Sequence, residues 1–168
     1  MKTSFLFRGL LGVGLFVTAQ MCAAGQFPPI AFLSIGFREA RLSDFSRSPF
    51  VSRRRVDPTG FLSVTADFNG DGQPDEARLL INNDRQIAYV VAVIETKQVD
   101  TYVLASYSLA GAEKIGIRAA PPQSDSGPAG IMVFDIQSNM GETSYFDGSE
   151  FNTTAPADGG SSNFRFPP

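Results

Sequence analysis

Residues 60–94 of the chain read GFLSVTADFNGDGQPDEARLLINNDRQIAYVVAVI. Apolar residues recur there at every second position on both sides of an acidic stretch, a period that is typical of β-strands with one buried face. They are Leu62, Val64 and Ala66 before the stretch, and Ala77, Leu79 and Ile81 after it. The run at 87–94 is continuously apolar and rich in β-branched residues, which indicates a strand covered on both faces. These residues therefore predict three neighbouring strands, the first two joined by the acidic stretch.

Five further stretches toward the C-terminus have the composition of strands. They are Tyr102–Leu109, Ile115–Arg118, Ile131–Ile136, Thr143–Phe146 and Glu150–Thr153. Asp147-Gly148, between the last two, predicts a two-residue type I′ hairpin, since both central residues of that turn need positive φ. We expect a mainly β, largely antiparallel, sheet or sandwich-like domain of about eight strands.

The chain before and after these strands has no clear period. Residues 25–58 are predicted to form an irregular segment in which Phe37–Ser46 makes one or two helical turns. Residues 59–154 would form the β domain, with a surface loop at 121–130, and residues 155–168 a flexible tail. The cluster Arg53-Arg54-Arg55 could contact a phosphate or a membrane, or be a processing site, but three charges alone favour a solvated stretch.

The first 24 residues have the features of a signal peptide. Lys2 and Arg8 supply positive charge before a short apolar run at 9–17. After this run, Cys22-Ala23-Ala24 offers small residues for cleavage after Ala24. Cleavage would remove two positive charges and no acidic residue, which changes the net charge from −3 to −5. We expect a secreted or periplasmic protein without a later transmembrane segment, with lipid anchoring through Cys22 as a minor alternative.

The composition excludes several classes of function. The chain has no histidine and no tryptophan. The absence of histidine removes the most common general base and the most common nitrogen ligand of metals. Lysine and arginine form no long basic run, so nucleic acid is not expected as a partner. The single cysteine lies in the signal region, so a mature chain would form no disulfide.

The acidic stretch has the spacing of a calcium loop. With Asp67 as its first position, residues that can offer oxygen ligands fall at alternate positions: Asp67, Asn69, Asp71, Gln73 and Asp75. Gln73 would contribute its backbone carbonyl, and Gly72 permits the sharp turn. Calcium takes about six to eight oxygens, and alternate residues of a tightly curled loop can direct them to one point. The alternative is a polar turn between strands.

The segment Ala66–Ala77 (ADFNGDGQPDEA) resembles the loop of the FG-GAP and VCBS repeat families, in which D-F-N-G-D-G-x-x-D joins two strands around calcium. The resemblance implies that Asp67, Asn69, Asp71 and Asp75 are ligands and that the domain is extracytoplasmic. The loop is not that of an EF-hand, because Arg78 occupies the position of the bidentate glutamate. Since the chain contains no second copy of the loop, a full propeller is not expected.

The favoured interpretation is an exported, non-catalytic calcium-binding β-domain with a structural role, or one that binds an unknown protein or glycan. A secreted glycoside hydrolase is an alternative, because two carboxylates can perform that chemistry without histidine. Its candidate acids are Glu95, Glu113, Asp135, Glu142 and Glu150. A third hypothesis is an adhesion or inhibitor domain that binds through exposed phenylalanines. The candidates for that contact are Phe45, Phe50, Phe164 and Phe166.

Overall fold

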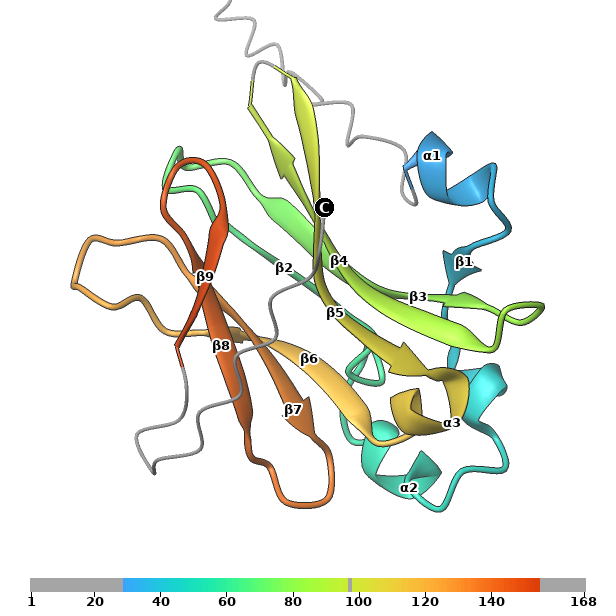
Figure 1. The fold of residues 1–168 in the computed structure, drawn as a ribbon. Coiled ribbons are helices and arrows are strands. Elements are labelled where there is room, and N and C mark those ends of the chain that lie inside the picture. Colours follow the sequence, from blue (N-terminus) through green and yellow to red (C-terminus); the bar gives the residue numbers. More distant parts are fainter. Residues whose placement is uncertain (1–28, 97, 155–168) are drawn as a thin grey trace, which may run out of the picture.

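The computed structural model describes residues 29–96 and 98–154 (Figure 1). The expected signal peptide with Cys22, the expected tail at 155–168, and Phe164 and Phe166 all lie outside these ranges. In chain order the elements are α1 (Ile30–Leu33), β1 (Arg38–Glu39), the 3₁₀ helix η1 (Leu42–Phe45), α2 (Val51–Arg54), β2 (Ser63–Ala66), β3 (Asp75–Asn82), β4 (Ile87–Glu95), β5 (Val99–Ser108), α3 (Leu109–Ala112), β6 (Ile115–Ala120), β7 (Gly130–Asp135), β8 (Gly141–Phe146) and β9 (Phe151–Thr154). Within the described ranges, no helix has the length and apolarity that a membrane crossing requires.

The strands form two antiparallel sheets. In the first, β3 pairs with β4, and β4 with β5, while β1 and β2 share the other edge of β3. In the second, β6, β7, β8 and β9 follow one another as a meander. Figure 1 shows the sheets as two layers, green to yellow and orange to red. The expectation of a mainly β, largely antiparallel domain that is not a propeller is confirmed.

All eight strands expected from the sequence are present, with ends that differ by a few residues. The structure adds β1, whose two residues are too short to produce a periodic signal. The helical turns expected at 37–46 are only partly correct, because this segment contains β1 and then the single turn η1. Short elements of this kind depend on contacts with the rest of the fold more than on local pattern.

The main core lies between the two sheets. Its buried side chains come from the inward faces of β3 and β4 and from the second sheet, and include Leu79, Val90, Ile117 and Ile131. Half-buried aromatic side chains continue this contact between the sheets. The ring of Tyr102 on β5 lies 5.4 Å from those of Phe146 and Phe151 on β8 and β9. The alternation of the sequence therefore corresponds to burial between two layers.

The irregular N-terminal segment covers part of the outer face of the first sheet. Phe37 is buried against Leu80 and Val91, which point away from the main core. The Phe37 ring stacks on Tyr89 at 4.7 Å, and Phe32 packs edge-on against both rings. This second cluster explains why β4 is apolar along its whole length, as a strand covered on both faces must be.

The three residues of the arginine cluster differ in burial, since Arg53 and Arg55 are exposed and Arg54 is not. The side chain of Arg54 is completely buried, and its guanidinium lies 4.3 Å from the centre of the Phe45 ring. Its Nη atoms donate hydrogen bonds of 2.8–3.1 Å to four backbone carbonyls, those of Gly60, Ala112, Glu113 and Ile115. The prediction of a solvated stretch was therefore wrong for Arg54. The sequence alone does not distinguish three consecutive arginines, because the difference between them arises from tertiary contacts.

Arg54 joins distant parts of the chain at one end of the sandwich. It connects α2 to the end of α3 and the start of β6, and Arg53 donates to the carbonyls of Ile136 and Gln137 beyond β7. Burial lowers the pKa of Arg54 to about 10, and the charge of Glu113 opposes this shift. The guanidinium therefore remains charged at neutral pH, stabilised by carbonyl dipoles and by the aromatic ring.

The β8–β9 turn also differs from the expectation. The strands end at Phe146 and resume at Phe151, so four residues connect them, and among these only Gly148 has positive φ. A type I′ turn would need positive φ at both central positions, so that prediction was wrong. The Asp147 carboxylate instead accepts hydrogen bonds from the amides of Ser149 and Glu150. These contacts hold its pKa near 2.

We predict that Arg54→Met lowers the free energy of unfolding by about 3–5 kcal/mol, because the backbone carbonyls that accept from Arg54 stay buried and lose a charged donor. Denaturant unfolding followed by circular dichroism measures the change. The neighbouring exposed Arg55 provides the matched control, and Arg55→Met should change stability by no more than about 0.5 kcal/mol. Equal effects of the two substitutions would contradict the structural role of Arg54.

Candidate metal centre

The acidic stretch forms the connection between β2 and β3, where Ala66 pairs opposite Asp75. Phe68, the second residue of this connection, is fully buried in the core between the sheets. The sequence analysis did not single out Phe68. Because burial of a phenylalanine contributes roughly 1.5–3 kcal/mol, this side chain fixes one side of the loop to the core.

The carboxylate of Asp67 organises the turn. Its Oδ1 accepts a hydrogen bond from the Gly70 amide at 2.6 Å, and its Oδ2 accepts one from the Gly72 amide at 2.8 Å. Both glycines have positive φ, near +80°, which residues with a side chain rarely adopt. The loop is therefore curled around Asp67 by interactions within the chain.

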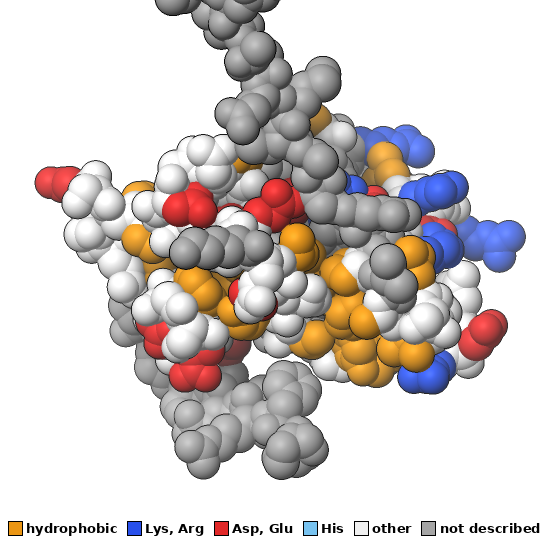
Figure 2. All heavy atoms as spheres, turned by 90° about the horizontal axis from the view of Figure 1, so that it is seen from above, with side chains coloured by type: hydrophobic (Ala, Val, Ile, Leu, Met, Phe, Trp, Pro, Cys, Tyr) orange, Lys and Arg blue, Asp and Glu red, His pale blue; other side chains and the backbone are white. Residues whose placement is uncertain are grey.

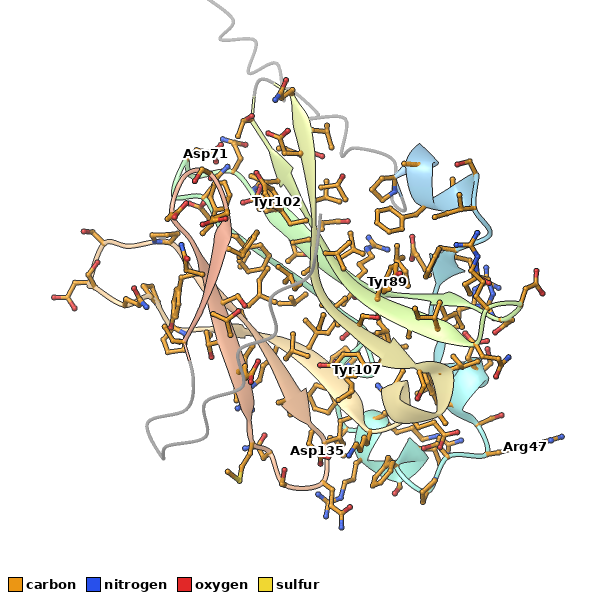
Figure 3. All side chains as sticks on the ribbon, in the orientation of Figure 1. Arg47, Asp71, Tyr89, Tyr102, Tyr107 and Asp135 are labelled. Atoms are coloured by element: carbon orange, nitrogen blue, oxygen red, sulfur yellow. The ribbon has the colours of Figure 1, made fainter. Side chains whose placement is uncertain are left out.

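Asn69 and Asp71 lie together on the outer part of the loop. Asn69 Oδ1 accepts from the Asp71 amide at 2.9 Å, and Asn69 Nδ2 donates to Asp71 Oδ2 at 3.1 Å. Asp71 Oδ1 accepts from the Gln73 amide at 2.8 Å. Asp71 is exposed, and Figure 3 shows it at one end of the sandwich. The structure thus places these two predicted ligands side by side, with Asp71 exposed and Asn69 half-buried.

Asp75 has a different environment from the other predicted ligands. It is only 1% exposed, and its carboxylate accepts hydrogen bonds from the amides of Phe68 at 2.9 Å and Glu95 at 3.0 Å. Burial raises the pKa of Asp75, and the charge of Asp71 adds to the rise, while the hydrogen bonds from Glu95 and Phe68 oppose it. Asp75 therefore joins the loop to the end of β4.

The three predicted carboxylate ligands have different surroundings. In the part of the chain that the structure describes, no three histidine, cysteine, aspartate or glutamate side chains are grouped so that they could hold a metal ion. Asp71 is exposed at the loop, whereas Asp75 faces the core. Two of the three carboxylates therefore differ in burial, one exposed and one in the core.

The chemistry of the loop nevertheless fits calcium. Its possible ligands are all hard oxygen atoms, and each carboxylate oxygen that accepts one N–H keeps a further lone pair. Four salt bridges occur among the described side chains, and none of them involves Asp67, Asp71 or Asp75. Burial is the main cause of the raised pKa of Asp75, and the charge of Asp71 adds to it. A cation would offset this repulsion between the two carboxylates.

The acids considered for glycoside hydrolysis lie on separate elements. Asp135, at the end of β7, accepts hydrogen bonds from the amides of Gln137 and Ser138, which lower its pKa, and lies 3.6 Å from Lys114 Nζ. Asp135 thus has a local role in stabilising the turn after β7.

A pocket of about 170 Å³ lies where β1 and β2 meet along the edge of β3. Its lining includes Glu39 and Arg78, which form a salt bridge of 2.6 Å, and Arg78 also contacts Glu76 at 2.9 Å. None of the five acids proposed for hydrolysis lines this pocket. The pocket therefore does not provide those acids with a common cleft.

Of the phenylalanines considered as adhesive contacts, only Phe45 and Phe50 lie in the part of the chain that the structure describes, and neither is exposed. Phe45 is 2% exposed and lies beneath the guanidinium of Arg54, so it is not available as the surface contact that the third hypothesis considers. Phe50 is half-buried. A loop phenylalanine that packs back onto the core stabilises the fold and is not available to a partner.

Comparisons with protein-family models, with curated proteins and with solved structures find no match for this chain. The likeness of the loop to FG-GAP and VCBS repeats therefore remains a resemblance between short motifs.

We predict that Asp75→Ala lowers the free energy of unfolding by about 2–5 kcal/mol in the presence of chelator, because the buried amides of Phe68 and Glu95 lose their acceptor. Chemical denaturation without metal measures this effect independently of calcium. Asp71→Ala, which removes an exposed carboxylate from the same loop, should cost less than about 1 kcal/mol under these conditions. A smaller loss for Asp75→Ala than for Asp71→Ala would contradict the assignment.

Proposed function

We propose that this chain is an exported, non-catalytic calcium-binding β-domain in which the metal stabilises the connection between β2 and β3. The observation that carries the proposal is the series of possible oxygen ligands from Asp67 to Gln73, curled at Gly70 and Gly72. Asp71 and Gln73 in this series are exposed, and Asp67 and Asn69 are half-buried. A turn alone would not require three carboxylates in nine residues, since their charges repel one another.

The calcium ligands would be the side chains of Asp67, Asn69 and Asp71 and the carbonyl of Gln73, with Asp75 as a further carboxylate at the base of the loop. Calcium would supply positive charge and a fixed coordination sphere to a segment that is anchored by Phe68. Zinc and copper suit this set poorly, because no histidine or mature-chain cysteine is available as a softer ligand. In this proposal the metal stabilises the fold and takes no part in chemistry on a substrate.

The proposed compartment is the periplasm or the extracellular space, reached through the signal features of residues 1–24. Calcium modules outside cells often have dissociation constants of roughly 10⁻⁴ to 10⁻³ M, which millimolar calcium satisfies. Figure 2 shows most of the acidic side chains on one side of the face seen from above, and most of the basic ones on the other. The acidic side favours the approach of cations. A partner would be a protein or a glycan.

We predict that calcium raises the melting temperature of the domain. At a tenfold excess over its dissociation constant, calcium would add about 1.4 kcal/mol to the free energy of unfolding. For a domain of this size the gain corresponds to a rise of roughly 3–6 °C. Differential scanning calorimetry in chelator and in calcium measures the shift.

The substitution Asp71→Ala should abolish the calcium-dependent rise. The matched control is Asp84→Ala, which removes an exposed carboxylate in the turn beyond the far end of β3; this variant should respond to calcium as the native protein does. The proposal fails if the native domain shows no response. It also fails if Asp71→Ala and Asp84→Ala respond equally, because the loop would then not be the site.

A further inference from the structure

The strand β5 lies at the edge of the first sheet. Among the strands that the structure describes, it pairs with β4 alone, along its whole length from Val99 to Ser108. Many of the backbone N–H and C=O groups of an edge strand point away from its sheet, where another strand can pair with them. Because β5 has ten residues, it offers a long row of such groups.

The composition of β5 does little to prevent pairing. Edge strands usually avoid it with charged side chains, above all lysine, or with proline. β5 contains no proline, and its only charged residue is Asp100, near its start. On its outer face, Val99 is 55% exposed and Val103 is 43% exposed. The segment 101–108 is therefore an uncharged edge.

A bulge in β5 limits which strand can pair with this edge. Val103 pairs with Val91 and Ala105 with Val90, so Leu104 is one extra residue on β5. A regular strand of another protein would have one residue too few opposite the bulge. A second copy of β5 carries the same extra residue, so the bulge favours this chain as its own partner.

The bulge also decides which side chains of β5 face the core. Val103 before it and Ser106 after it both lie on the outer face, beside Val91 and Tyr89 of the second cluster. Four side chains of β5 pack against the main core: Tyr102, Leu104, Ala105 and Tyr107. Residues of even number thus face the core before the bulge, and residues of odd number face it after the bulge.

We propose that β5 pairs antiparallel with β5 of a second copy of this chain, about a two-fold axis between Leu104 and Ala105. Tyr102 would lie opposite Tyr107 of the second copy, and Val103 opposite Ser106 of the second copy. Core-facing side chains then meet core-facing ones, and outer side chains meet outer ones, on both sides of the bulge. Without the bulge, this register would place core-facing residues opposite outer ones.

The paired strands would join the first sheets of the two copies into one continuous sheet. Backbone hydrogen bonds supply the affinity in this mode of association. Asp100 lies outside the paired segment 101–108, so no like charges oppose one another in it. Because one strand makes a smaller interface than the roughly 1,200 Å² of stable complexes, we expect a dissociation constant in the micromolar range. This association does not involve the acidic connection and goes beyond the proposed function.

Sedimentation equilibrium of the protein in chelator tests this association across the micromolar range of concentrations. A single monomer–dimer equilibrium is expected. A monomer at every concentration would overturn the proposal, whether β5 is then unpaired or is covered by other residues of its own chain or by a different protein.

Two pairs of substitutions test the register. Val103→Lys with Ser106→Lys would place like charges opposite one another across the axis, and so would Val103→Glu with Ser106→Glu. Each double variant should raise the dissociation constant of the dimer at least about tenfold. An equimolar mixture of the two should dimerise again, because every lysine then lies opposite a glutamate. Melting curves by circular dichroism check that both variants fold.

The matched control is Val56→Lys with Met140→Lys, which changes two exposed apolar residues outside β5 and should dimerise as the native protein does. A dimer that persists in both charge variants would overturn the proposal, since another surface would then form the interface. Failure of the mixture of folded variants to dimerise would overturn it as well, because the register would then be wrong.

Hydrogen exchange of the native protein, resolved by residue with NMR, provides a second measurement that needs no variant. Exchange of amides in the segment 101–107 should slow as the protein concentration rises. The amides of Ser149 and Glu150, which donate to Asp147 within the β8–β9 turn, should exchange at a constant rate. Exchange in 101–107 that does not depend on concentration would contradict the pairing of β5 with a second copy.

Discussion

The hydrogen bonds of the buried Asp75 carboxylate hold together the parts of the molecule on which the proposed site depends. Asp75 is the first residue of β3, and it accepts from the amide of Phe68 in the preceding connection and from that of Glu95 at the end of β4. A carboxylate that is 1% exposed costs free energy unless its oxygens are satisfied. These two amides satisfy it, and in doing so they fix where the loop leaves and rejoins the sheet.

Arg54 is a buried charge of the opposite sign, and it too needs partners. This buried cation is compensated by carbonyl oxygens and by the Phe45 ring, without a carboxylate partner in the salt bridges of the described residues. Both buried charges thus use backbone groups as partners. Each buried charge is satisfied only when these backbone groups are in place. It therefore specifies one arrangement of the segments around it.

The sequence determined much of the architecture because strand burial has a period of two. The same period also predicts the position of Asp75: it has the parity of Ala77, Leu79 and Ile81, so its side chain must face the core. The interpretation of Asp75 as one of five ligands did not take this period into account, since it was based on the spacing of the oxygen-bearing residues in the loop. Arg54 had no such signal, because its carbonyl partners near residues 112–115 are brought to it only by the tertiary fold. The prediction for the β8–β9 turn was wrong for a local reason. Asp147 accepts hydrogen bonds from the amides of Ser149 and Glu150, which follow it, and the connection has four residues.

The central claim is that the β2–β3 connection holds calcium. A crystal structure of the protein grown in calcium, with an anomalous difference map, tests this most directly. One strong peak is expected at about 2.3–2.6 Å from side-chain oxygens of Asp67, Asn69, Asp71 and Asp75 and from the carbonyl of Gln73. A well-ordered loop without such a peak, at calcium concentrations of several millimolar, would contradict the claim and leave the acidic stretch as a polar turn held by Asp67 and Asp75.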